Sequence, residues 1–150
     1  MLKKKLNEII EYAARQEFLE EVQKAKMEYQ QVVGNIFEDD KSYENHMASF
    51  LEWYTFDRLM TGNTLTPFLA FIAHKKQSWA SETLNDYISM TNHIHAIFVV
   101  KKVKKDYVVV VNLFDNTKRK VWENESEIIF RKNDIFEGRI LPYQGKTYFT

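Results

Sequence analysis

The chain of 150 residues contains no cysteine, only 4 glycines and only 2 prolines. Without a thiol there is no disulfide, no cysteine-ligated zinc or iron–sulfur centre and no cysteine nucleophile. No two glycines are adjacent, which excludes a glycine-rich phosphate-binding loop. Composition alone therefore removes several common kinds of site.

Long uncharged apolar runs are also missing. The longest one, residues 67–73, is much shorter than the roughly 18 to 20 apolar residues that cross a bilayer. Near the amino terminus, Glu8, Glu11 and Arg15 interrupt the segment that would form the apolar part of a signal peptide. We therefore expect a protein with no membrane partner and a cytoplasmic location.

An excess of charge of one sign is the third absence. The chain has 21 Lys and Arg residues and 21 Asp and Glu residues, for a formal net charge of +0. Residues 34–92 nevertheless carry 4 basic and 8 acidic side chains, whereas residues 93–150 carry 11 basic and 7 acidic ones. A neutral chain is a poor candidate for a protein that coats DNA, but its basic part remains a candidate contact for a polyanion.

Apolar side chains, by contrast, are plentiful. The chain is 45% hydrophobic and 15% aromatic, which excludes wholesale disorder. Apolar residues recur in helical steps of three and four before Thr91, and they alternate or form β-branched runs after it. This change predicts an α+β fold, with a helical region over residues 1–92 and a small β-barrel of the SH3 or OB type over residues 93–150.

The helical region is predicted to begin with one long helix over residues 3–33, which Gly34 ends in a left-handed conformation. Thr66 and Ser78 have the residue types that cap helix N-termini. Three shorter helices are therefore expected over residues 43–61, 67–74 and 79–90.

The length of the first helix suggests self-association. At 1.5 Å per residue it would extend over roughly 45 Å, more than a small domain can cover. We therefore expect the chain to form a dimer through this helix, or to bind another protein with it. The residues expected at that contact are Leu6, Ile10, Phe18, Val22 and Tyr29.

The barrel is expected to consist of short strands joined by tight turns. Asp115 and Asn116 favour a turn, and Gly138 permits a bend within a strand. The chain ends in a turn at Gln144 and Gly145 and a final short extended segment. The four longer strands are predicted over residues 94–100, 107–114, 118–124 and 135–143, with a short strand or turn over residues 128–134.

Several segments together resemble a group of uncharacterised bacterial proteins that combine an aromatic helical region with a small β-barrel. The matching segments are residues 50–58 (FLEWYTFDR), 65–71 (LTPFLAF), 96–100 (AIFVV), 112–117 (NLFDNT) and 133–142 (NDIFEGRILP). Some members also carry a cysteine-rich SEC-C zinc motif, which this chain lacks because it has no cysteine. The resemblance implies the fold described above and assigns no chemistry.

Candidate catalytic and metal-binding residues are few. His93 and His95 are two residues apart on a predicted strand, so they share a face as two metal ligands would. Neither an HExxH nor an ExxH spacing accompanies them, and a polar pair at a helix-to-strand junction is the alternative. Glu52 and Asp57 would lie about 140° apart around a helix axis, which does not suit paired catalytic carboxylates. We assign no cofactor and no catalytic residue.

The basic side chains of the barrel fall into two groups. The groups are expected at opposite ends of the second strand, about 23 Å apart, with a common groove on a curled barrel as the alternative, and Arg119 is expected on the other face from its two neighbours. Lysines at a hairpin turn also discourage strand pairing between molecules, so a solvated surface is the alternative to a binding site. The residues are Lys101, Lys102, Lys104 and Lys105 around the first hairpin turn, and Lys118, Arg119 and Lys120 at the start of the third strand.

These observations favour a non-enzymatic interaction or assembly module that self-associates through the long helix and presents the barrel to a partner protein. The alternative is sequence-tolerant binding of nucleic acid through the basic barrel. An unrecognised hydrolase is a third interpretation, which no nucleophile motif supports.

Overall fold

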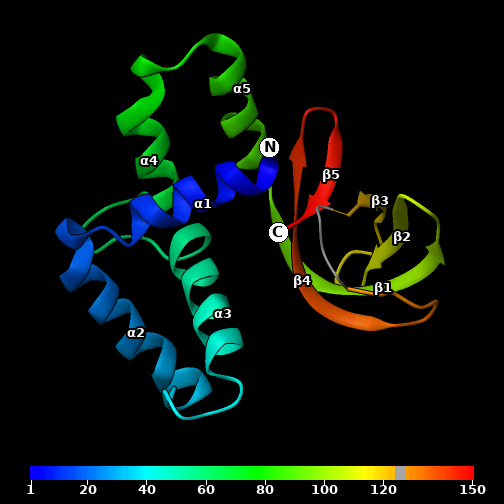
Figure 1. The fold of residues 1–150 in the computed structure, drawn as a ribbon, viewed down its shortest axis with the longest axis horizontal. Coiled ribbons are helices and arrows are strands. Elements are labelled where there is room, and N and C mark those ends of the chain that lie inside the picture. Colours follow the sequence, from blue (N-terminus) through cyan, green and yellow to red (C-terminus); the bar gives the residue numbers. More distant parts are fainter. Residues whose placement is uncertain (124–127) are drawn as a thin grey trace. The chain divides into compact units, whose positions relative to one another are not determined.

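The computed structural model describes residues 1–123 and 128–150 (Figure 1). The chain divides into a helical unit, Lys4–Ser78, and a barrel unit, Trp79–Thr150 together with Met1–Lys3. The predicted α+β class is confirmed, because the described residues form helices first and then a closed barrel of five strands. The sequence-based boundary after residue 92 differs from this division, since helix α5 (Ser81–Met90) groups with the barrel.

The predicted single helix over residues 3–33 is wrong. In its place the structure has α1 (Leu2–Ala13), a short 3₁₀ helix (Gln16–Phe18) and α2 (Leu19–Val33). Arg15 between them is extended, with a ψ of 155°, and so ends the helical path. In a straight helix Ala13 and Ala25 would lie about 18 Å apart. The break allows both of them to join one core with Phe50 and Tyr54.

The end of α1 is stabilised by that same core. A helix that ends at Ala13 leaves backbone carbonyl groups without helical partners. The hydroxyl of Tyr54 donates a hydrogen bond of 3.0 Å to the Ala13 carbonyl oxygen. Burial raises the pKa of Tyr54 to about 12, with a smaller contribution from Glu21. The hydroxyl therefore stays protonated and able to donate.

Helix α3 (Tyr43–Phe56) supplies the central residues of the helical core, Phe50 and Tyr54, whose rings stack at a centroid distance of 6.2 Å. It ends five residues earlier than predicted. The following helix, α4 (Pro67–Lys75), begins as predicted, because the Thr66 hydroxyl accepts a hydrogen bond from the Leu69 backbone N–H at 3.3 Å.

The segment after α3 is held by a nearly buried arginine. The Arg58 Nε and Nη2 atoms donate to the two Glu28 carboxylate oxygens at 2.8 and 2.9 Å, and Nη1 donates to Glu21 at 2.6 Å. Hydrogen bonding to Arg58 lowers the pKa of Glu28. Burial alone would raise the pKa of Glu21, but hydrogen bonds from Arg58 and Thr61 bring it below its usual value. These bonds join the segment after α3 to α2.

Helix α5 starts two residues later than predicted, and Ser78 is not its cap. The Ser78 hydroxyl donates instead to the Lys75 carbonyl oxygen at 2.7 Å, and Ala80 occupies the N-cap position. Trp79 stacks on Tyr87 of α5 with ring centroids 4.3 Å apart. The Ser89 hydroxyl approaches the Pro142 carbonyl oxygen at 3.3 Å, so α5 belongs to the same compact unit as the strands.

The barrel has the closed order β1-β2-β3-β5-β4. Strand β1 pairs antiparallel with both β2 and β4, and β4 with β5, whereas β3 and β5 run parallel. Strand β4 has the predicted bounds but is continuous through Gly138 and is not ended by Pro142, which pairs with Thr147; residues 128–134 contain a turn and no strand. Asn124, the predicted end of the third strand, lies outside the described residues. The strands are β1 (Ile94–Val103), β2 (Tyr107–Asn112), β3 (Lys118–Trp122), β4 (Ile135–Tyr143) and β5 (Lys146–Phe149).

The barrel interior is filled by aliphatic and aromatic side chains that alternate with outward-facing residues. Gly138 lies opposite Ala96 on the inner side, and a Cβ atom there would lie 3.3 Å from the Phe136 ring. The missing side chain therefore leaves room for that ring in the core. The buried core residues are Ala96, Phe98, Val100, Val108, Val110, Val121, Phe130, Ile140 and Phe149.

Candidate nucleic-acid interface

The strand pairing of β2 with β1 and β3 places some residues of the two predicted basic groups close together. Val109 of β2 pairs with Lys102 on one side and with Lys120 on the other. Two strand spacings separate the backbones of these lysines, which is about 10 Å. Lys118 pairs with Val111, two residues along the same face of β2. The expectation that the groups lie at opposite ends of the second strand is therefore wrong for these residues.

A β-bulge explains how Lys102 reaches this position. The β1–β2 register shifts between Val100 and Lys102, so Lys101 is the extra residue. The surface bounded by Lys102, Val109, Lys118, Arg119 and Lys120 encloses a hollow of about 320 Å³, which we call the lysine hollow. Lys104 and Lys105 follow in the loop before β2 and are exposed.

The lysine hollow is lined by four basic side chains, Lys102, Lys118, Arg119 and Lys120. In the part of the chain that the structure describes, no carboxylate pairs with Lys102, Lys118 or Lys120. All three side chains are exposed, and Val109 between them is 8% exposed. Ammonium groups at such spacing repel one another unless an anion lies between them. The arrangement thus suits a ligand with more than one negative charge.

A row of aromatic side chains continues the same outer face. Tyr107 of β2 pairs with Trp122 of β3, which pairs with Tyr148 of β5, and all three are half-buried. The Tyr107 and Trp122 ring centroids are 5.3 Å apart. The Lys120 Nζ lies 5.3 Å from the Tyr107 ring centroid, and the Lys146 Nζ lies 5.4 Å from that of Trp122. Cationic groups and aromatic faces therefore occur together here.

Sequence reasoning could not separate these rings from core residues. The signal that distinguishes them is parity along each strand. Tyr107 is two residues from Val109, and Trp122 is two residues from Lys120, so each ring shares the outward face. Phe114, in the turn after β2, is 73% exposed and does not belong to the barrel core.

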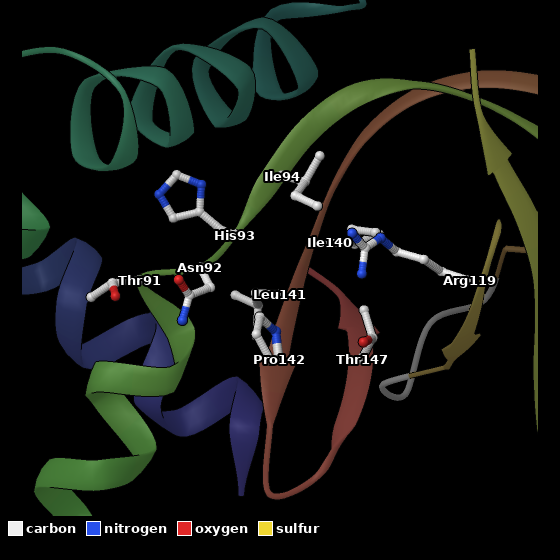
Figure 2. A pocket seen from close by; sticks show the side chains of 9 residues that line it. All are labelled: Thr91, Asn92, His93, Ile94, Arg119, Ile140, Leu141, Pro142 and Thr147. Carbon is white, nitrogen blue, oxygen red and sulfur yellow. The ribbon is translucent and has the colours of Figure 1, made fainter. Parts of the chain in front are cut away.

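A second hollow, of about 530 Å³, lies where β3 separates from β5 (Figure 2). Among the described residues, these two strands pair at one position, Trp122 with Tyr148. Arg119 lines this hollow as well as the lysine hollow. We call it the end hollow, and its remaining lining residues are Thr91, Asn92, His93, Ile94, Ile140, Leu141, Pro142 and Thr147.

The two histidines have other partners. The Arg139 Nη1 atom and the His93 Nδ1 atom are 2.8 Å apart, so this ring nitrogen accepts a hydrogen bond from the guanidinium. The His95 Nε2 lies 3.1 Å from a Glu137 carboxylate oxygen. Among the described residues, no three histidine or carboxylate side chains are grouped to hold a metal ion.

The residues expected at a dimer contact are used within the chain. Leu6 is buried, while Val22 and Tyr29 pack against the core around Phe50. Phe18 lies beside Tyr12, with ring centroids 5.4 Å apart, and Ile10 is half-buried. Because the long helix is broken, the length argument for a dimer no longer applies. Self-association stays a prediction, now without the contact set that supported it.

Comparisons with known protein families, with curated proteins and with solved structures give no match. Each helix among the described residues is too short or too polar to cross a bilayer. A functional assignment for this chain therefore depends on the geometry of the barrel.

Proposed function

We propose that the protein binds single-stranded nucleic acid without strong sequence preference, through the outer face of β1, β2 and β3. The observation that carries this proposal is the lysine hollow, where Lys102, Lys118 and Lys120 surround Val109. Clustered lysines attract the phosphates of a nucleic-acid backbone and release its counterions, whatever the base sequence.

The row formed by Tyr107, Trp122 and Tyr148 favours binding of a single strand rather than of a duplex. In a single strand the faces of the bases are free to stack on aromatic side chains, and each stacked base contributes about 1–3 kcal/mol. Tyr107 and Trp122 adjoin the lysine hollow on the same face. A strand whose phosphates follow the lysines can therefore place bases on these rings.

The topology of the barrel also favours binding on this face. We infer that it is an OB-type barrel, because its five strands follow the non-sequential order β1-β2-β3-β5-β4 and, among the described residues, one pair closes it between β3 and β5. Barrels of this type bind oligonucleotides on strands 2 and 3 and on the loops that join strands 1–2 and 4–5. Here those loops contribute Lys104 and Lys105, and lead into Lys146.

The test is a salt titration with a fluorescein-labelled single strand of twelve nucleotides, followed by fluorescence anisotropy. The variant replaces Lys102, Lys118 and Lys120 with serine. Each phosphate contact contributes about 0.7 to the slope of log affinity against log salt for a single strand, so the slope should flatten by about 2. The same strand annealed to its complement should bind the wild type more weakly.

The control variant replaces Lys41, Lys75 and Lys76 of the helical unit with serine, which changes the net charge by the same amount. It should keep the wild-type slope and affinity. An equal loss of affinity in both variants would mean that net charge alone governs binding. No anisotropy change for the wild type near 50 mM salt, where phosphate contacts are strong, would refute the proposal.

A further inference from the structure

The end hollow has the composition of a small-ligand site. Its volume of about 530 Å³ falls within the range typical of such sites, roughly 300–1,000 Å³. Ile94 of β1, Ile140 and Pro142 of β4 give it an apolar wall, while Asn92 and Thr147 add groups that form hydrogen bonds (Figure 2). This combination fits a planar, partly polar ring such as a nucleobase.

Arg119 supplies the charge in this hollow. It pairs with Val110, a core residue, whereas Lys118 and Lys120 pair with the outward-facing Val111 and Val109. Its side chain therefore leaves β3 on the other face from the two lysines. Figure 2 shows it extending from β3 toward Ile140 and Thr147. A guanidinium can bind a phosphate through two parallel hydrogen bonds and can also stack on a base.

The two hollows share one lining residue, Arg119, whose strand separates them. Among the described residues, β3 pairs with β5 at one position, Trp122 with Tyr148, and Arg119 precedes that position on β3. A strand held by Lys118 and Lys120 therefore lies within reach of Arg119, which is the residue between them on β3.

We propose that the end hollow receives one unstacked nucleotide of the bound strand, with its phosphate on Arg119 and its base against Ile94, Ile140 and Pro142. This inference rests on the proposed function, because the lysine hollow must first hold the strand. A free mononucleotide presents the same phosphate and base, so the experiment has to distinguish the two sources.

The probe is the twelve-nucleotide strand with 2-aminopurine at each position in turn, because the emission of this base rises when it leaves the stack. The wild type should raise the emission at one position or two neighbouring positions well above the others. Arg119→Gln should abolish that rise and weaken binding by about tenfold, the loss expected for one charge-assisted contact. Its matched control is Arg131→Gln, which removes an exposed arginine that lines neither hollow.

A second variant tests the hollow without changing charge. Thr147→Phe fills the space between β5 and Arg119, and it should abolish the 2-aminopurine rise while anisotropy still reports binding of the strand. Circular dichroism checks that both variants keep the fold. A rise that persists in both variants would overturn the proposal.

The remaining outcomes distinguish a failure of the nucleotide site from a failure of strand binding, and a nucleotide of the bound strand from a free mononucleotide. No anisotropy change for the wild type would mean that the proposed function itself fails, whereas binding without any 2-aminopurine rise would overturn only the nucleotide site. If free 2-aminopurine ribonucleotide binds the wild type and not Arg119→Gln, while the strand shows no rise, the hollow binds mononucleotides and the strand assignment is wrong.

Discussion

The two units use charge in opposite ways. The helical unit contains 9 basic and 12 acidic side chains, and the barrel unit contains 12 basic and 9 acidic ones. In the helical unit Arg58 is 8% exposed and is bonded to Glu21 and Glu28. In the barrel unit Lys102 and Lys120 are exposed on either side of an apolar residue. A paired, buried cation stabilises the first unit, whereas the exposed lysines of the second, which have no carboxylate partner among the described residues, are available to a ligand.

The sharpest test of that contrast is removal of the nearly buried arginine. Arg58→Ala leaves the Glu21 carboxylate, which is only 15% exposed, without its main partner. Breaking a buried pair in this way costs about 3 kcal/mol of the free energy of unfolding. Urea unfolding followed by circular dichroism at the helical band measures the loss.

The control for this prediction is Arg15→Ala. Arg15 pairs with Glu17 at the surface, where the two side chains are 40% and 59% exposed. Exposed pairs contribute about 1 kcal/mol or less. Equal losses in the two variants would show that burial of the pair is irrelevant and would remove the contrast between the units.

A second prediction concerns the barrel, whose stability we attribute to apolar packing. Gly138→Val places a branched side chain against the Phe136 ring, where even a Cβ would lie 3.3 Å away. Overpacking of this kind costs about 2 kcal/mol. Thermal melting measures the effect, and Gly138→Ala should cost less. A valine variant that melts with the wild type would mean that the barrel core is loosely filled.

A third prediction tests the break between α1 and α2. Tyr54→Phe removes the hydroxyl that donates to the Ala13 carbonyl oxygen and leaves this buried acceptor without it. The expected cost is about 1–2 kcal/mol of the free energy of unfolding. Urea unfolding measures it, with Tyr43→Phe of the same core as the control, and a loss no larger than the control's would argue against this role for Tyr54.

The smallest effect expected is an acid sensitivity of the helical unit. The pKa values of Glu21 and Glu28 lie below their usual value of 4.5 in the folded state. Their contribution is therefore complete above that pH and is lost as the pH falls through the folded-state values. Melting temperature measured from pH 7 to pH 3 should fall less in Glu28→Gln, in which one carboxylate can no longer be protonated. An unchanged pH dependence would contradict this linkage.

Much of the fold follows from apolar periodicity. The alternating pattern placed β4 at its observed ends, and Thr66 followed by proline marked the start of α4. The break at Arg15 could not be predicted, because the residues around it, Ala13, Ala14 and Gln16, all favour helix. The break is accompanied by a hydrogen bond between Ala13 and Tyr54, which are 41 positions apart in the chain, and local helix propensity cannot predict such a contact.

The candidate site could be predicted only in part from the sequence, for a similar reason. Strand parity correctly placed Arg119 on the other face from Lys118 and Lys120. The approach of Lys102 to Lys120 depends on the register of β1 against β2, which a bulge alters. Sequence alternation cannot report a register, because it gives the facing of a residue and not its partner on the next strand.

The bulge has a consequence for how this chain can vary over generations. Because Lys101 is the extra residue between the pairs Val100–Val110 and Lys102–Val109, its deletion would leave both pairs intact. An insertion or deletion within a strand ordinarily reverses the facing of every residue that follows. At this one position the barrel can gain or lose a positive charge by a change in length, while Lys102 and the residues after it keep their partners.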